Sequence, residues 1–291
     1  MAFIARVKSL FAGNRLDVRS RFELLREAIS GTMSKFYMAR DRRSGKIVGL
    51  KVLDPEKTLA FESRFKGLKK PSEGQIAVRF DHPYIVRTFE HGRTTDGDPY
   101  LVMEFLEGPG MNSVLVARDD GLLDGRRVRF LRQAAEALLV VHKAGFIHRD
   151  VCPRNLILTG DRQSVKLTDF GLTVPATEPF TRPGNRVGTP DYMAPEVARR
   201  FRTDKRLDVF AFGATAYEIC TYELPWRRGV TGAAAMTHDQ PPVDVREHRP
   251  GINRQLAEAI HACIEPDVEK RCPSMEQFLA AIYNVKHEDA K

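Results

Sequence analysis

The feature that most constrains this chain is a pair of polar motifs separated by a short apolar stretch. The first runs from His148 to Asn155 (HRDVCPRN), and the second is Asp169-Phe170-Gly171. Two apolar runs between them, 156–158 and 165–167, flank a Gly-Asp turn signal and predict a hairpin of short strands. Such a hairpin would bring Asn155 and Asp169 close together. The pattern therefore predicts a single site with three oxygen-bearing side chains, including Asp150.

Together the two motifs resemble the catalytic loop and the metal-binding turn of protein kinases. Either tripeptide alone would be a chance match, but the two occur in order at a spacing that suits one hairpin. The resemblance implies that Asp150 accepts the proton of the substrate hydroxyl. It also implies that Asn155 and Asp169 bind Mg²⁺, with Mn²⁺ as the alternative, because Mg²⁺ prefers oxygen ligands that it shares with phosphate and water.

A strand upstream supplies a candidate phosphate contact. Val48-Gly49-Leu50-Lys51 places Gly49 and Lys51 on one face and resembles the kinase Val-Ala-Ile-Lys strand. The resemblance implies that Lys51 pairs with ATP phosphates and with a helix glutamate, for which Glu73 has the expected position. Because Pro71 and Gly74 crowd this segment, we expect a short helix that begins near Pro71, with a separate helix upstream over 59–66.

The glycine-rich loop expected before that strand is poor in glycine. Residues 22–53 read as strand, turn, strand, turn and strand, and the first turn aligns with the kinase Gly-x-Gly-x-x-Gly loop. Only Gly31 remains, because Ile29 and Ser34 replace the other two glycines. Where a positive φ is required, such a replacement costs roughly 1 kcal/mol or more. We therefore expect the loop to cover ATP less tightly than usual.

Resemblance to the kinase hinge implies where the adenine base binds. Residues 100–108 look like the strand that leads into it, which implies that Met103 lies behind the adenine. The resemblance also implies that backbone groups from Glu104 to Leu106 bind the edge of the adenine. Gly49 and Ile157, which lie on the two strands described above, complete the expected nucleotide-binding residues.

The segment after the second motif resembles the substrate-docking loop of serine/threonine kinases. It reads GTPDYMAPE over 188–196 and implies a contact of Thr189 with Asp150 and an ion pair of Glu196 with Arg271. Residues 173–187 show neither the helical nor the strand spacing of apolar residues, which predicts a mobile loop.

The apolar run 207–220 predicts a helix that is buried on all sides. Asp208 within it either anchors the catalytic loop or caps the helix. Upstream, the apolar spacing over 128–141 predicts a core helix that leads into the catalytic loop.

Two residues of the catalytic loop qualify the resemblance. Cys152 stands where serine/threonine kinases usually carry a lysine, and its position suggests a target for thiol reagents. Arg154 falls where many tyrosine kinases place an arginine, so the positive charge is recovered two residues away. Arg149 implies control by phosphorylation of the following loop. The candidate acceptors are Thr173, Thr177 and Thr181, while Asn185 occupies the place of the usual primary site.

Composition agrees with an enzyme domain in a reducing cytoplasm. The chain has 291 residues, 42% of them hydrophobic, and four cysteines without metal-ligand spacing. The net charge of +8 is spread along the chain without a nucleic-acid motif. No apolar run is long enough to span a membrane. Residues 3–11 form an apolar helical face that either docks on the domain or lies on a membrane surface.

A basic cluster near the docking loop favours acidic protein substrates, although such a run is also compatible with a solvated face. Its members are Arg199, Arg200, Arg202, Lys205, Arg206, Arg227 and Arg228.

The sequence thus predicts an α+β fold with two lobes, a small antiparallel β-sheet lobe (21–105) and a larger helical lobe (106–285). An extension (1–20) precedes this kinase domain and a tail (286–291) follows it. The leading hypothesis is an ATP-dependent protein kinase that acts on Ser or Thr hydroxyls. The alternatives are a pseudokinase scaffold, suggested by Ile29, Ser34 and Cys152, and a small-molecule phosphotransferase.

Overall fold

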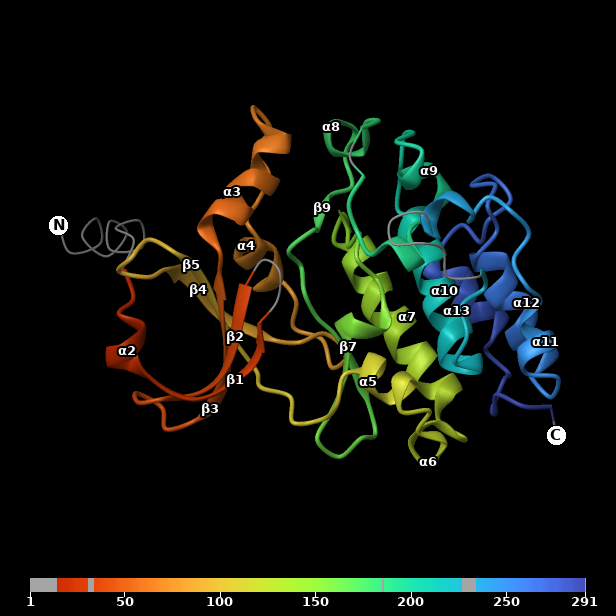
Figure 1. Ribbon diagram of the computed structural model, residues 1–291, viewed down its shortest axis with the longest axis horizontal. Helices are drawn as coiled ribbons and strands as arrows, with labels where there is room; N and C mark the ends of the chain where they lie inside the picture. Colours follow the sequence, from red (N-terminus) through yellow and green to blue (C-terminus); the bar gives the residue numbers. More distant parts are fainter. Residues whose placement is uncertain (1–14, 31–33, 185, 227–233, 291) are drawn as a thin grey trace. The chain divides into compact units, whose positions relative to one another are not determined.

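The structure is a computed structural model that describes residues 15–30, 34–184, 186–226 and 234–290 (Figure 1). The chain divides into two compact units. Unit 1 comprises the described residues up to 81 together with 86–106, and unit 2 comprises 82–85 and the residues from 107 onward. Several residues singled out above lie outside the described residues, namely 3–11, Gly31, Asn185, Arg227 and Arg228.

Unit 1 is built on a five-stranded antiparallel sheet in the order β1-β2-β3-β5-β4. Its strands are β1 (Phe22–Ser30), β2 (Ser34–Asp41), β3 (Ile47–Leu53), β4 (Thr88–Arg93) and β5 (Pro99–Met103). The three strands predicted within 22–53 are thereby confirmed. A short helix, α2 (Val18–Arg21), precedes them and is capped by Asp17.

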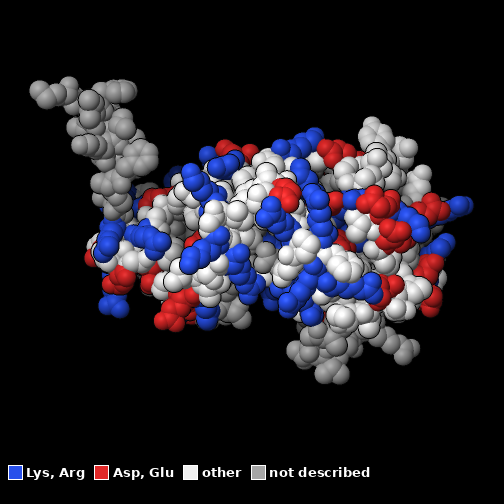
Figure 2. All heavy atoms as spheres, turned by 90° about the horizontal axis from the view of Figure 1, so that it is seen from above, with Lys and Arg blue, Asp and Glu red and all other residues white. Residues whose placement is uncertain are grey.

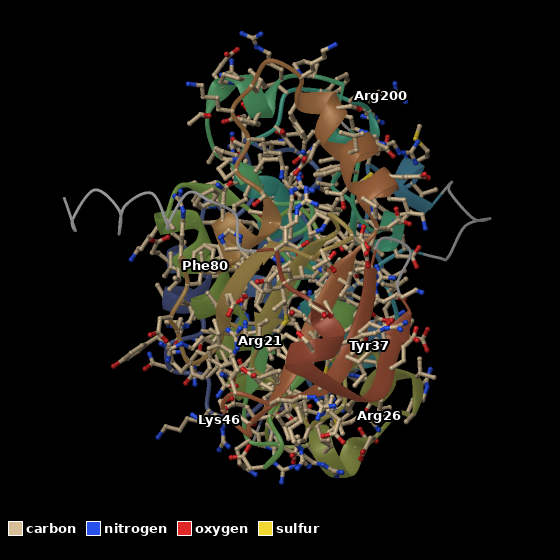
Figure 3. The ribbon with its side chains drawn as sticks, turned by 90° about the vertical axis from the view of Figure 1, so that its left-hand side faces the viewer. Arg21, Arg26, Tyr37, Lys46, Phe80 and Arg200 are labelled. Carbon is tan, nitrogen blue, oxygen red and sulfur yellow. The ribbon has the colours of Figure 1, made fainter. Side chains whose placement is uncertain are left out.

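One face of this sheet is closed by a cluster of buried apolar side chains, because β-strand residues alternate between faces. The cluster contains Leu16, Phe22, Ala39, Val48, Leu50, Tyr100 and Val102. At its margin Arg21 (Figure 3) donates to Glu90 at 2.8 Å and to Asp41 at 3.2 Å. Tyr100 also donates to Glu90, at 2.6 Å, so α2, β2, β4 and β5 share one polar network.

The two helices predicted before His82 are present with different bounds. α3 (Pro55–Glu62) begins four residues earlier than expected, because Asp54 caps it and Pro55 fits its first turn. The 3-10 turn η1 (Ser63–Phe65) follows. α4 (Glu73–Ala77) begins two residues after Pro71, because Ser72 and Gln75 form a reciprocal capping box.

Unit 2 is mainly helical. Its longer helices are α5 (Met111–Val116), α7 (Arg127–Lys143), α10 (Arg206–Thr221), α12 (Arg254–Cys263) and α13 (Met275–Ala281). Its single-turn elements are α6 (Asp120–Leu123), η2 (Pro153–Asn155), α8 (Glu178–Thr181), η3 (Pro190–Tyr192), α9 (Pro195–Ala198), η4 (Ala234–Met236) and α11 (Val245–His248). The predictions of a core helix over 128–141 and of a helix buried on all sides over 207–220 are confirmed, since every residue from Leu207 to Thr221 is buried.

Two short sheets complete unit 2. The predicted hairpin is present as β7 (Leu156–Leu158) and β8 (Val165–Leu167), and Leu167 also donates its backbone N–H to Tyr84. β6 (Phe146–Ile147) pairs with β9 (Val174–Pro175). The sequence predicted a mobile loop over 173–187 and missed β9 and α8, which form within it. Such two-residue and four-residue elements are too short to show a sequence period.

The C-terminal residues pack within unit 2. Glu288 is fully buried and accepts hydrogen bonds from the Gly125 backbone at 2.7 Å and from Arg127 at 3.3 Å. Arg127 is fully buried as well and also donates to the Ile219 carbonyl. Within the described part of the chain, no helix is both long and apolar enough to cross a membrane.

Candidate functional site

The loop that carries Asp150 is anchored by one buried carboxylate. Asp208, on α10, accepts the backbone N–H of His148 at 2.7 Å and that of Arg149 at 2.8 Å. It also bonds the His142 ring at 2.9 Å. Burial raises the pKa of Asp208, but the bond from His142 and the other donors outweigh burial, and the pKa is lowered. Of the two interpretations left open above, the loop anchor is the one present.

Two non-glycine residues at this site have left-handed backbone conformations. Arg149 has a φ of 71° and Asp169 a φ of 64°. Such conformations cost free energy and persist only where surrounding contacts impose them. The bonds to Asp208 impose the conformation of Arg149. A bond from the Gly171 N–H to Asp169 Oδ1, at 3.1 Å, accompanies the conformation of Asp169.

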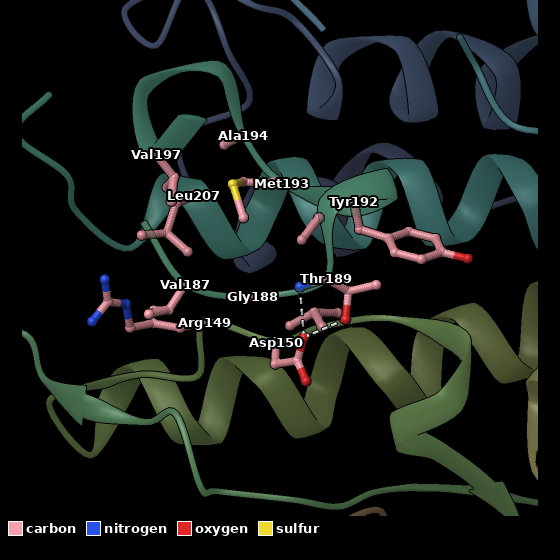
Figure 4. A pocket seen from close by; sticks show the side chains of 12 residues that line it. Arg149, Asp150, Val187, Gly188, Thr189, Tyr192, Met193, Ala194, Val197 and Leu207 are labelled. Atoms are coloured by element: carbon pink, nitrogen blue, oxygen red, sulfur yellow. Dashed lines mark hydrogen bonds between the residues drawn. The ribbon is translucent and has the colours of Figure 1, made fainter. Parts of the chain in front are cut away.

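The carboxylate of Asp150 is held on both oxygens. Its Oδ1 accepts the hydroxyl of Thr189 at 2.7 Å and the Thr189 backbone N–H at 3.1 Å (Figure 4). Its Oδ2 accepts Nδ2 of Asn155 at 3.0 Å. Gly188 makes this approach possible, because its φ is 118° and a Cβ there would lie 2.8 Å from the Arg149 carbonyl oxygen. The predicted contact of Thr189 with Asp150 is confirmed.

Arg154 extends this arrangement with a contact that the sequence did not predict. Its guanidinium donates to the Thr189 hydroxyl at 2.9 Å, and that hydroxyl in turn donates to Asp150. Cys152 is 1% exposed, and burial followed by the charge of Asp150 raises its thiol pKa to about 11. The expectation of a target for thiol reagents was therefore wrong, because the reactive thiolate is disfavoured and the sulfur is covered.

The polar groups fit a hard cation that shares its coordination with other ligands. Asn155 uses its amide nitrogen for both bonds to Asp150, at 2.7 Å to the carbonyl and 3.0 Å to Oδ2, so its amide oxygen is the atom that can bind metal. Asp169 supplies a half-buried carboxylate. Among the described residues no three His, Cys, Asp or Glu side chains converge, as a dedicated protein cage would require. Mg²⁺ fits this donor set, because it usually takes its remaining ligands from water and phosphate.

Lys51 and Glu73 form the predicted ion pair within unit 1. Lys51 Nζ lies 2.6 Å from Glu73 Oε1, and both side chains are about nine-tenths buried. Glu73 is the first residue of α4, so its position depends on the Ser72 cap. Gly74 lets this helix approach β4, since a Cβ there would lie 2.4 Å from the His91 Cβ.

Gly49 lies among aromatic and apolar side chains of unit 1. A Cβ at Gly49 would lie 2.6 Å from the Phe36 ring and 3.1 Å from Met103. Phe36 also faces Phe105, with 6.4 Å between ring centroids and a 13° interplanar angle. Sequence reasoning did not assign Phe36 and Phe105 to the site. The available signal was the glycine in the Val-Gly-Leu-Lys strand, which leaves room for a large neighbour.

The remaining nucleotide-binding candidates follow β5 or lie on β7. The Glu104 backbone N–H donates to the Arg87 carbonyl, so the backbone group of Glu104 suited to a base edge is its own carbonyl. Leu106 and Ile157 are half-buried, the first in unit 1 and the second on β7 of unit 2. Ile29 and Ser34 belong to β1 and β2, whose extended backbone does not require glycine.

The docking loop borders a small pocket beside Asp150 (Figure 4). Its apolar lining includes Val187, Met193, Val197 and Leu207. The predicted ion pair that ends this loop is confirmed, with Arg271 donating to Glu196 at 2.8 and 2.9 Å.

The three proposed phosphate acceptors differ in exposure. Thr173 and Thr181 are buried, and Thr173 donates to the His148 carbonyl. Thr177 is exposed at the start of α8. Of these three, Thr177 alone is open to a modifying enzyme in this conformation.

The basic cluster is paired in part. On the face shown in Figure 2, Lys and Arg side chains are interspersed with Asp and Glu. Arg199 pairs with Asp239, and Arg206 pairs with Asp204 and Glu269. Lys205 donates to the His142 carbonyl. Within the described part of the chain, Arg200, Arg202 and Lys205 are the members of the cluster for which no ion pair is described.

Comparison with known proteins places this chain in a family. The Protein kinase domain family matches residues 22–283. Serine/threonine-protein kinase pkn3 of Myxococcus xanthus is 32% identical, over 96% of this chain and 52% of that protein. Serine/threonine-protein kinase PknA of Mycobacterium tuberculosis is 34% identical, over 84% of this chain and 57% of that protein. The chain thus spans about half the length of these relatives.

Proposed function

The chain belongs to the protein kinase family, and we propose that it transfers the γ-phosphoryl group of Mg-ATP to Ser or Thr hydroxyls of proteins. The catalytic domain is proposed to cover residues 21–285, in support of which the family matches 22–283. The observation that carries the proposal is the Asp150 carboxylate, whose two oxygens are fixed by Thr189 and Asn155.

Asp150 is proposed as the base. Its Oδ1 already accepts two hydrogen bonds from Thr189, whereas Oδ2 accepts one from Asn155. A carboxylate oxygen can accept two, so Oδ2 is the atom that would receive the substrate hydroxyl. The bonds fix the carboxylate before the substrate arrives, which reduces the entropy lost in reaching the reactive geometry.

Asn155 and Asp169 are proposed to hold Mg²⁺. When bound, the metal would neutralise charge on the transferring phosphoryl group. Arg154 is proposed to supply the positive charge that Cys152 lacks, because its guanidinium already lies next to the Thr189 hydroxyl. A buried thiol with a raised pKa cannot take that role.

Unit 1 contributes the proposed nucleotide contacts. Lys51, oriented by Glu73, would bind phosphate oxygens. Gly31, Gly49 and Met103, together with the backbone of Glu104 and Leu106, are proposed to bind ATP, and Ile157 of unit 2 is proposed as a further contact. The ring of Phe36 adds an apolar surface beside Gly49 and Met103. Aromatic rings suit the flat faces of a purine base.

We propose that the docking loop binds a protein substrate, because Thr189 joins that loop to the proposed base, Asp150. Arg200 and Arg202 would favour acidic residues in the substrate. A cytoplasmic location is proposed on the scarcity of cysteine and the free state of all four thiols.

A second candidate is a weakly active or inactive nucleotide-binding scaffold. It is favoured by the length of α4, which is five residues, and by the loss of the lysine at Cys152. The complete set of Lys51, Glu73, Asp150, Asn155 and Asp169 favours the enzyme instead, because a scaffold needs no base.

Transfer of radiolabelled phosphate from ATP to the chain itself and to dephosphorylated casein separates the two candidates. Wild type should label casein, whereas Asp150→Asn should lower the rate by about 100-fold or more, because it removes the proton acceptor. Lys51→Met should lower it as well. Equal labelling by all three proteins would reject the enzyme. Thermal stabilisation by Mg-ATP without any transfer would support the scaffold.

A further inference from the structure

His238 is a buried histidine that contacts the docking loop from another part of unit 2. It lies just after η4 and is 2% exposed. Its Nδ1 lies 2.7 Å from the backbone carbonyl oxygen of Met193, whose side chain lines the pocket beside Asp150. A carbonyl oxygen only accepts hydrogen bonds, so Nδ1 must carry the proton and donate it.

Two aromatic rings fix the orientation of the His238 ring. Trp226 lies 4.5 Å away, centroid to centroid, at an interplanar angle of 31°, and Phe210 lies at 5.8 Å and 32°. Trp226 is itself held, because its indole N–H donates to the Gln240 carbonyl at 2.9 Å. A ring packed in this way has little freedom to turn away from Met193.

The same aromatic group carries the contact that holds the other end of the loop. The Arg271 guanidinium lies over the Phe210 ring, 4.9 Å from its centroid, and bonds both carboxylate oxygens of Glu196. The segment from Met193 to Glu196 is thus held at its first residue by His238 and at its last by Arg271. Phe210 touches both holding side chains.

The His238 ring is suited to a fixed bond. Burial lowers its pKa, while the bond to Met193 and the charges of Asp191 and Asp239 act in the opposite direction. The ring is therefore neutral near pH 7, and a neutral ring has one N–H, which the Met193 carbonyl occupies.

We propose that His238 is a positioning residue for protein substrates: its bond to the Met193 carbonyl holds the docking loop against Asp150, so that loss of the bond weakens binding of the protein substrate and spares ATP. The proposal rests on the kinase function proposed above. The described hydrogen bond and ring contacts of His238 run to Met193, Trp226 and Phe210, which have no proposed part in nucleotide binding, which is why the nucleotide should be unaffected.

Two variants of the full chain separate the donor from the ring. His238→Phe keeps an aromatic ring between Trp226 and Phe210 but has no N–H, and His238→Asn keeps a donor in the place of Nδ1 without the ring. The readouts are KM for dephosphorylated casein, KM for ATP, kcat, and the thermal midpoint. The loss of one hydrogen bond corresponds to about a tenfold rise in the casein KM of His238→Phe. KM for ATP should stay within about twofold, and His238→Asn should recover much of the loss.

Amide hydrogen exchange of residues 189–196 gives a measurement that does not depend on activity. Exchange there should be faster in His238→Phe than in wild type and close to wild type in His238→Asn. Equal exchange in wild type and His238→Phe, or equal rises of both KM values, would overturn the proposal. Should wild type transfer no phosphate, the proposed function fails, and the exchange rates still decide whether His238 holds the loop.

Discussion

Asp150 and Lys51 are the central residues of the two units, and the chain holds them in different ways. The loop of Asp150 is fixed by two backbone hydrogen bonds to Asp208, and its carboxylate by three more from Thr189 and Asn155. The described hydrogen bond of Lys51 runs to Glu73, on a helix of five residues. The contacts around Asp150 come from several separate partners, so they tolerate the loss of one of them.

The difference also concerns the supporting helices. α10 is buried along its length, so packing stabilises it. α4 is too short to form in isolation, because helix nucleation is costly, and it relies on its cap and on the approach of β4 that Gly74 allows. The base is therefore set by the interior of unit 2, and the lysine by a few local contacts in unit 1.

Asp208→Ala should produce the largest effect. The substitution leaves the ring of His142 and two backbone N–H groups buried without their acceptor. Removal of one member of such a buried group costs about 3–5 kcal/mol, which chemical denaturation would measure. Glu258→Ala is the control, because its ion pair with Arg254 is exposed, and no measurable loss is expected. A loss below about 1 kcal/mol for Asp208→Ala would show that the catalytic loop does not depend on this carboxylate.

Gly49→Ala tests the packing of unit 1. The new methyl group would meet the Phe36 ring at 2.6 Å, and moving that ring should cost about 1–2 kcal/mol and weaken ATP binding. The double variant Gly49→Ala with Phe36→Val restores the space. Thermal unfolding and ATP titration should show recovery in the double variant. Equal losses in both variants would contradict the assignment of Phe36 as the neighbour that requires a glycine.

The sequence predicted the elements whose residues repeat or whose partners stand in fixed motifs. The hairpin around Asn155, the buried helix that carries Asp208 and the Lys51–Glu73 pair all follow from such local signals. The start of α4 was misplaced, because proline indicated a first turn while the Ser72–Gln75 capping box determined it. β9 and α8 were missed because elements of two and four residues carry no period.

Contacts between distant residues were beyond the sequence for a different reason. The bond of Arg154 to Thr189 joins residues 35 positions apart, and that of His238 to Met193 joins residues 45 apart. The sequence around Arg154 or His238 does not indicate which residue will accept its hydrogen bond, since arginine and histidine donate to many acceptors. The accessibility of Cys152 to thiol reagents was misjudged similarly, because its burial depends on the folded loop.

Ser72→Ala should have a smaller effect that is confined to unit 1. The Ser72 side chain accepts the Gln75 N–H, and loss of an N-cap costs about 1 kcal/mol. Amide exchange within α4 should accelerate, and kcat/KM for ATP should fall because Glu73 loses its fixed position. Ser63→Ala is the matched control, since the described hydrogen bond of that hydroxyl runs to the Ala60 carbonyl and not to an N-terminal N–H of a helix. Unchanged exchange in α4 would show that tertiary packing alone holds the glutamate.

Acid should weaken unit 2 slightly through His261. Its Nε2 accepts the backbone N–H of Val245 at 3.1 Å, which requires an unprotonated nitrogen. Burial lowers its pKa against the opposing charge of Asp244, so the folded histidine binds a proton less readily than the unfolded one. Its contribution to stability is therefore complete above about pH 6.5, where an unfolded histidine is neutral, and is lost as the pH falls below that value. Because the ring is partly exposed, solvent screening should limit the loss to a few tenths of a kcal/mol.

Denaturation at pH 7.5 and 5.5 should show a larger decrease in the free energy of unfolding for wild type than for His261→Gln, whose amide oxygen accepts the same N–H without titrating. Equal decreases would assign the acid sensitivity to other groups.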